Sequence, residues 1–169
     1  MASTLPVVVT IEPLVGFERV QKVAPTPHTQ GRLMYGVRVS AGIPRVSLEG
    51  ELTKASDRED FPLQGQTIQD TDERLKLGLR SRVNEGSLFS VFLRAGGQAT
   101  RNTHEVTQSG ATSKTIGKIA YDPYAGLGLG VSLASYFELD GGITAVFNQF
   151  PDMSKNDYQA TLGFTIRYP

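Results

Sequence analysis

The chain contains no cysteine and no tryptophan, and its formal net charge at pH 7 is zero because 17 Lys and Arg residues balance 17 Asp and Glu residues. Without cysteine, disulfide bonds and thiolate chemistry are excluded. A chain of zero net charge lacks the basic footprint of a nucleic-acid-binding protein, so we expect no nucleic-acid partner. We also expect neither a metal nor an organic cofactor.

Long apolar runs are also missing. No stretch approaches the roughly 18 consecutive apolar residues of a transmembrane helix. The first residues, MASTLPVVVT, contain neither the basic region nor the apolar core of a secretory signal, so we expect any signal peptide to lie outside this sequence. A length of 169 residues predicts a single domain over residues 1–169.

Helical spacing is nearly absent, and a period of two takes its place. Apolar side chains alternate with polar or small ones in eight segments, which cover residues 7–19, 33–43, 45–54, 74–83, 88–99, 119–133, 137–148 and 157–169. In the last segment the apolar side of the alternation consists of Tyr158, Ala160, Leu162, Phe164, Ile166 and Tyr168. This period predicts β-strands.

The connections between these segments alternate in length. Longer polar loops are expected at residues 22–31, 55–71, 100–116 and 150–156, and short turns near 42–44, 84–86 and 134–136. This order predicts antiparallel hairpins joined in sequence. Because the number of strands is even, the first can pair with the last. The sequence therefore predicts an all-β, eight-stranded antiparallel up-and-down barrel.

Soluble and transmembrane barrels share this period but place opposite faces in water. The polar face is rich in glycine, for example at Gly16, Gly36, Gly78, Gly126, Gly128 and Gly130. The lumen of an eight-stranded barrel is narrow, so small residues fit there. The glycines therefore favour a transmembrane barrel with its polar face inside and its apolar face against lipid.

The charged residues of the polar face carry both signs and are expected to form a lumen polar network. An unpaired buried charge is costly, so a balanced set suits a closed interior. The predicted network consists of Glu12, Arg38, Glu49, Glu51, Arg74, Lys76, Arg80, Arg94, Glu138, Asp140 and Arg167.

Counting residues along the hairpins predicts which of these charges meet. Glu49 and Glu51 come near Lys76 and Arg74 on the next strand. In the last hairpin, Glu138 is expected opposite Arg167. Across the first hairpin, Arg38 is expected to reach Glu12 diagonally.

Aromatic residues stand at the ends of the apolar stripes and predict two girdles at the membrane interfaces. Near the long loops they are Phe17, Tyr35, Tyr121, Phe147 and Tyr158, and near the tight turns they are Phe89, Phe137 and Tyr168. A strand of about 11 residues at ~3.3 Å each, tilted by ~40°, spans roughly 28 Å, close to the ~25 Å apolar band of such barrels.

Two stretches resemble a known family. YAGLGLGVSLASYFELDGGITAVF, residues 124–147, is similar to the glycine-alternating penultimate hairpin of small eight-stranded outer-membrane barrels of the OmpA transmembrane-domain, OmpX and Ail type. YQATLGFTIRY, residues 158–168, resembles their C-terminal signal for the outer-membrane assembly machinery. One departure is Pro169, because the family pattern ends on the aromatic. Either a periplasmic extension follows residue 169, or this chain tolerates the extra residue.

The resemblance implies a bacterial outer-membrane protein with outer-membrane lipid and lipopolysaccharide around it. Eight strands enclose side chains rather than an open channel, so a general diffusion pore is not expected. We expect a structural, adhesion or surface-interaction role, in which the four polar loops bind an unknown surface ligand. The acidic group Asp57, Glu59 and Asp60 in the second loop could hold a cation or simply be solvated.

Three other functions are compatible with the sequence. Some barrels that resemble this one modify lipid A, and His104 and Glu105 with Ser109 or Ser113 form the one conceivable catalytic cluster. We nevertheless do not expect an enzyme, because a polar loop is a poor place to preorganise such a cluster. A narrow ion path would require the charge pairs to rearrange. A soluble, lipocalin-like barrel would place the apolar stripe inside around a lipophilic ligand.

Detergent dependence separates the soluble barrel from the transmembrane barrel. We expect the chain to aggregate in buffer and to fold only with detergent or lipid, because its apolar stripe faces outward. A heat-modifiable shift in gel electrophoresis measures folding. A monomer that stays folded in detergent-free buffer would contradict the transmembrane arrangement.

Overall fold

The computed structural model describes residues 7–22, 28–43, 45–62, 65–83, 88–148, 152 and 156–168. Pro169 and parts of the expected connections, including residues 23–27, 84–87 and 153–155, lie outside the described residues. The strands of the described part are β1 (Val8–Lys22), β2 (His28–Ile43), β3 (Val46–Phe61), β4 (Gln66–Val83), β5 (Phe89–Gln108), β6 (Ala111–Ile116), β7 (Ala120–Ala134), β8 (Phe137–Val146) and β9 (Asp157–Tyr168). No helix in these ranges is long and apolar enough to cross a membrane.

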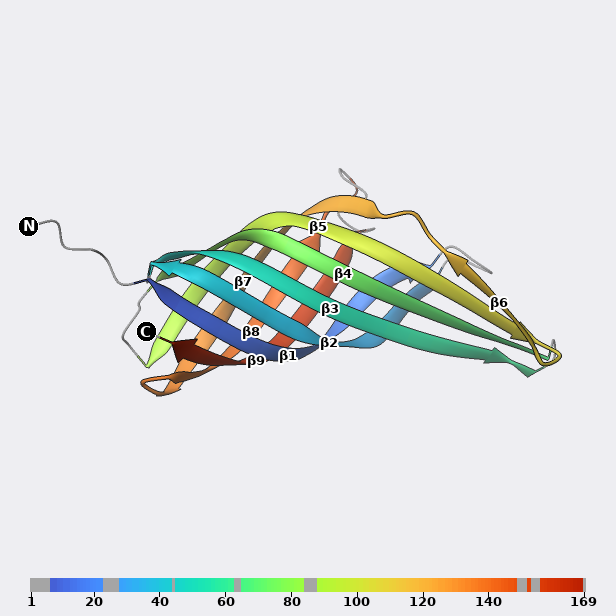
Figure 1. The fold of residues 1–169 in the computed structure, drawn as a ribbon, viewed down its shortest axis with the longest axis horizontal. Helices are drawn as coiled ribbons and strands as arrows, with labels where there is room; N and C mark the ends of the chain where they lie inside the picture. Colours follow the sequence, from blue (N-terminus) through green and yellow to red (C-terminus); the bar gives the residue numbers. More distant parts are fainter. Residues whose placement is uncertain are drawn as a thin grey trace, which may run out of the picture.

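Eight of these strands close into a barrel (Figure 1). Each pairs antiparallel with its neighbours, and β5 pairs with β7 because β6 lies outside the ring. The ring is completed between β1 and β9, where Val9 lies opposite Tyr168. This confirms the predicted eight-stranded up-and-down barrel and places the ends of β1 and β9 side by side.

The second and third connections differ from the prediction of polar loops. Residues 55–71 and 100–116 are largely strand, because β3, β4 and β5 continue beyond the barrel and β6 returns along β5. Both faces of these extensions carry polar side chains, so the hydrophobic alternation that marks a membrane strand disappears. The turn signal was present in Ser109 and Gly110, whose φ angles of 51° and 83° fit a two-residue hairpin turn.

The barrel wall has an apolar outside and a polar inside. Leu127, Leu162 and Phe164 expose 58%, 51% and 38% of their surface on the exterior. Glu49 and Arg80 are each 3% exposed and lie inside. This distribution suits lipid outside and polar contacts within, as expected for a transmembrane barrel and opposite to a lipocalin.

Two irregularities interrupt the ladders. Between β1 and β9 the pairing omits Glu12 and Pro13 without changing register, in keeping with the N–H group that proline lacks. Between β7 and β8 the register shifts at Ser132 and Ala134. Both positions leave the closed ring intact.

A charge on the lipid face tests the orientation of the wall. We expect Leu127→Arg, near the middle of the apolar band, to lower the free energy of unfolding by about 2–4 kcal/mol in lipid vesicles. The matched control is Thr115→Arg on β6, an exposed position outside the band that we expect to be neutral. Urea unfolding measures both variants, and equal stability would contradict the assigned orientation.

Candidate functional site

The lumen is filled by an ion-pair network along its whole length. Within the described residues, the ion pairs inside the barrel join eight acids with eight bases, the acids being Glu12, Glu18, Glu49, Glu51, Asp57, Asp72, Glu138 and Asp140 and the bases Arg32, Arg38, Arg74, Lys76, Arg80, Arg82, Arg94 and Arg167. Balanced charge lets each ion be compensated in a space that excludes most solvent.

Glu51 is the centre of the middle group. Its carboxylate accepts a hydrogen bond from Lys76 Nζ at 2.5 Å, from Arg38 Nε at 2.8 Å and from Arg94 Nη2 at 2.7 Å. Lys76 Nζ also donates to Gln159 Oε1 at 2.6 Å. Donors from three strands, β2, β4 and β5, therefore converge on one carboxylate of β3 that is 1% exposed.

A second group lies toward the tight-turn end. Glu12 accepts from Arg38 Nη1 at 2.5 Å and from Arg80 Nη1 at 3.0 Å, and so links the two groups. Arg80 Nη2 donates to Asp140 Oδ2 at 2.9 Å, and the hydroxyl of Thr165 donates to the same oxygen at 2.6 Å.

Glu138 completes this end of the network. Ser90 Oγ donates to Glu138 Oε1 at 2.7 Å. Arg82 and Arg167 both donate to Glu138 Oε2. Two cations from different strands thus close the lumen around one carboxylate.

A third group lies at the hairpin end. Arg32 donates to Glu18, Asp72 and, at 3.1 Å, Asp57. Arg74 contacts Glu18 Oε2 and Asp72 Oδ2, each at 2.7 Å. Charges from four strands therefore meet where the barrel passes into the hairpins.

Apolar and aromatic side chains fill the space between the ions. The Arg80 guanidinium lies 3.9 Å from the ring centre of Phe92, a cation–π contact. Phe92 is 1% exposed. A Cβ added to Gly128 would collide with the Phe92 ring, which explains this glycine by close packing. Around Phe92 the lumen is therefore packed with side chains.

The eleven residues of the predicted network all lie in this lumen, but several partners differ. Arg38 is directly opposite Glu12 rather than diagonal to it. Arg74 pairs with Glu18 and Asp72 rather than with Glu49 or Glu51, and Glu49 instead contacts Arg94 at 2.6 Å.

The last hairpin also has a different register. Glu138 lies opposite Thr165, so the predicted alignment of Glu138 with Arg167 was two residues out of register. The side chain of Arg167 nevertheless reaches Glu138, since a long arginine side chain spans that offset.

Sequence reasoning missed the hairpin-end group. Glu18 was in a predicted strand, but Arg32 and Asp72 lay between the predicted loops and the predicted strands, one and two residues before the expected strand starts. The signal that could have found them is the two-residue spacing, which continues back from Arg38 to Arg32 and from Arg74 to Asp72.

The aromatic residues predicted as girdles lie on the exterior or are half-buried. Exposed on the outer face are Phe17, Tyr35, Phe89, Tyr121, Phe137 and Tyr168, while Phe147 and Tyr158 are half-buried. Phe137 and Phe164 stack with ring centres 5.5 Å apart. Their role as interfacial anchors remains a prediction.

The candidate catalytic residues do not form a triad. His104 Nδ1 lies 2.6 Å from Asp70 Oδ1, while Glu105 contacts Lys114 at 2.9 Å. Ser113 lies opposite Val106, and Ser109 is at the hairpin turn. The His104 side chain is therefore held by Asp70 of β4.

The acidic group of the second loop is also divided between the faces of β3. Asp57 contacts Arg32, and Asp60 accepts from Thr67 Oγ1 at 2.7 Å and Arg58 Nε at 3.2 Å. These two hydrogen bonds, the one from Thr67 first, lower the pKa of Asp60. The described residues include no group of three His, Asp or Glu side chains placed to hold a metal.

Solved structures give the context for this geometry. Ail, the attachment invasion locus protein of Yersinia pestis, solved with the heparin analogue sucrose octasulfate, has a TM-score of 0.64 at 12% identity, and the match covers 97% of this chain and 100% of that chain. A major outer membrane protein of Thermus thermophilus gives 0.61 at 13% identity, with 96% and 100% covered. Neisserial surface protein A gives 0.56 at 11% identity, with 95% of each covered. This chain has the fold of the small outer-membrane β-barrels.

The likeness to these outer-membrane barrels rests on structure, because neither the family models nor the curated sequences compared with this chain match it. At such low identity the shared feature is the barrel itself. The same wall is therefore compatible with different side chains in the lumen and at the hairpins.

Removing one partner of the central group tests the network. We expect Glu51→Gln to lower the free energy of unfolding by about 3–5 kcal/mol, because three cations lose their shared carboxylate. The control is Glu73→Gln, whose ion pair with Arg101 is on the exposed exterior and contributes little. Urea unfolding in vesicles compares the two, and equal midpoints would contradict a stabilising network.

Proposed function

We propose that the protein is a bacterial outer-membrane barrel that presents a rigid sheet for contact with another surface. The observation that carries this proposal is the continuation of β3, β4, β5 and β6 as one hydrogen-bonded sheet beyond the apolar band (Figure 1). We orient the barrel with its hairpins projecting outward from the cell and its tight turns facing the periplasm, because outer-membrane barrels have short periplasmic turns and longer extracellular loops.

The projecting sheet is ordered by its own contacts. Pairing between β4 and β5 continues as far as Gln66 and Gln108. All six residues of β6 are exposed, and Lys114 of β6 contacts Glu105 of β5. A preordered surface loses less conformational entropy on binding than a mobile loop, so it suits recognition.

The packed lumen argues against transport as the main activity. Ion movement would require several of the buried pairs to separate, and each separation would leave an uncompensated charge. The same pairs hold the wall closed beneath the hairpins. The lumen is therefore proposed as a structural plug that supports the exposed sheet.

The solved barrels support an interaction role. Ail is named for attachment and invasion and was solved with a heparin analogue. A second similar structure is a neisserial surface protein. By analogy, the ligand of this chain is proposed to bind the hairpins at residues 55–71 and 100–116, with residues 22–31 and 150–156 as further contacts.

The proposed position in the outer membrane also sets which molecules contact the barrel. Lipid and lipopolysaccharide contact its exterior, and the assembly machinery is proposed to read the last strand. No catalytic role is proposed, because His104 is bonded to Asp70 and Glu105 to Lys114.

Shortening a hairpin tests the interaction role. In the variant, an Asn-Gly turn replaces residues 104–115 and joins Thr103 to Ile116, which already lie opposite each other. Cells carrying the intact protein are expected to adhere to immobilised heparin or to cultured epithelial cells, and cells carrying the variant to adhere several-fold less.

A second variant shortens the β3–β4 hairpin between the paired residues Ser56 and Thr71 and is also expected to lower adhesion. The control is Arg45→Gln in the tight turn before β3, at the opposite end of the barrel, which is expected to adhere as the intact protein does. Heat-modifiable migration of all three variants shows that their barrels are folded. Equal adhesion by cells with and without the intact protein would overturn the proposal.

A further inference from the structure

An apolar trough runs down the exterior of the wall along β5, below the hairpins. It consists of an upper hollow of about 620 Å³, which extends across β2, β3, β4 and β5, and a lower hollow of about 460 Å³, which lies on β5 between β4 and β7. Leu75 and Ala99 line both hollows, so the two are continuous.

The trough exists because β5 carries small residues between bulky neighbours. Ala99 lies between Leu75 and Tyr121, and one step lower Gly97 lies between Leu77 and Pro123. A Cβ added to Gly97 would meet no atom within 4 Å. The floor is therefore the backbone of β5, and the sides are the side chains of β4 and β7.

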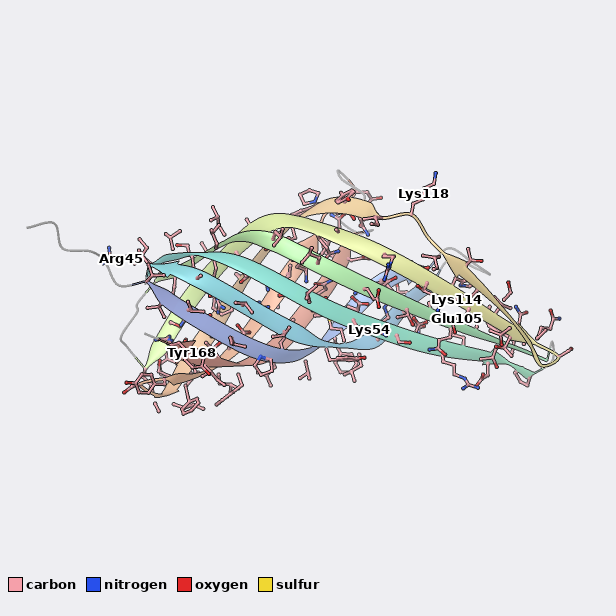
Figure 2. The ribbon with its side chains drawn as sticks, in the orientation of Figure 1. Arg45, Lys54, Glu105, Lys114, Lys118 and Tyr168 are labelled. Carbon is pink, nitrogen blue, oxygen red and sulfur yellow. The ribbon has the colours of Figure 1, made fainter. Side chains whose placement is uncertain are left out.

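Basic side chains stand at the upper end of the trough. Lys54, Glu73 and Arg101 lie opposite one another in a row across β3, β4 and β5. Glu73 pairs with Arg101, and Lys54 interacts electrostatically with the same carboxylate. Figure 2 shows Lys54 on the outer surface of the sheet, with Lys114 farther along the hairpin.

From this arrangement we propose that the trough binds a phosphorylated, acylated glycolipid of the outer leaflet, with an acyl chain along β5 and a phosphate at Lys54 and Arg101. The proposal rests on the outward direction of the hairpins in the proposed function. A hollow with apolar walls and cations at one end is complementary to a lipid whose charge and chains are at opposite ends. The row lies where the apolar band ends, at the depth of a lipid headgroup.

The order of exterior residues along β3, β4 and β5 confines the proposed lipid site to the level where the apolar band ends. Below the row the exterior positions are Leu52, Leu75 and Leu77, which contact chains, whereas Lys54 and Arg101 occupy the next exterior positions above. A bulky residue at either small position would fill the trough without entering the lumen.

The test measures lipid binding to the refolded protein in detergent micelles by native mass spectrometry. The probes are phosphorylated lipid A, the same lipid A after dephosphorylation, and phosphatidylglycerol. We expect one phosphorylated lipid A per protein, with dephosphorylated lipid A and phosphatidylglycerol each about tenfold weaker.

Two variants address the two halves of the site. Gly97→Phe is expected to weaken binding about tenfold because its ring fills the trough. Lys54→Gln is expected to weaken phosphorylated lipid A about tenfold and to leave dephosphorylated lipid A unchanged. Should Gly97→Phe fail to fold, Ala99→Leu fills the same trough.

Two controls match these changes. Gly141→Phe places the same ring on the lipid face of β8, where an added Cβ meets only Leu162 at 3.9 Å. Arg45→Gln removes a charge at the opposite end of the barrel (Figure 2). Both are expected to bind lipid A as the original chain does.

The proposal is overturned if Gly97→Phe binds like the original chain, if Gly141→Phe is equally impaired, or if phosphatidylglycerol binds as tightly as lipid A. Adhesion of cells to heparin is a separate measurement that depends on the hairpins. If cells with the intact protein adhere no better than cells without it while lipid A still binds, the surface role alone is contradicted. If adhesion depends on the intact protein but lipid A does not bind, the trough alone is contradicted.

Discussion

Closure of the hydrogen-bonded ring between β1 and β9 is the constraint on which the other features depend. A strand edge facing hydrocarbon would leave backbone N–H and C=O groups without partners, so a strand-based wall has to close on itself. Closure after eight strands fixes a narrow interior. The interior then admits few side chains, and those it admits have to fit one another.

The charged side chains fit because most of the carboxylates are shared between two or three cations. Glu51 receives donors from Arg38, Lys76 and Arg94, and Glu12 joins Arg38 to Arg80. Sharing connects strands that are far apart in the sequence across the short diameter of the barrel. The network therefore links the strands of the closed ring that encloses it.

The exterior divides into three zones along the barrel. The middle is apolar wall, the hairpin end carries a row of charges at Lys54, Glu73 and Arg101, and beyond it the sheet is polar on both faces. The change from one polar face to two separates the membrane wall from the projecting surface. The zones follow from side-chain chemistry, because β3, β4 and β5 run through all three without interruption.

Much of the barrel could be predicted from local spacing, but the extensions could not. The alternation around Leu127 and Leu162 sets the lipid face one strand at a time. Arg32 and Asp72 follow the same spacing beyond the apolar zone, yet without an apolar partner face the spacing carries little information about where a strand ends. Hairpin counting also failed at Glu138, because residues 150–156 gave no signal for the register of the last pair.

The sequence by itself determined the strands of the wall, their order and which face meets lipid, because these depend on a two-residue period and on short connections. The tertiary structure alone decided which charges meet, how far the hairpins project and that Ala99 and Gly97 form a trough. Those features depend on residues brought opposite one another by register and by closure of the ring. Neither the register nor the closure of the ring is encoded in any single segment of the sequence.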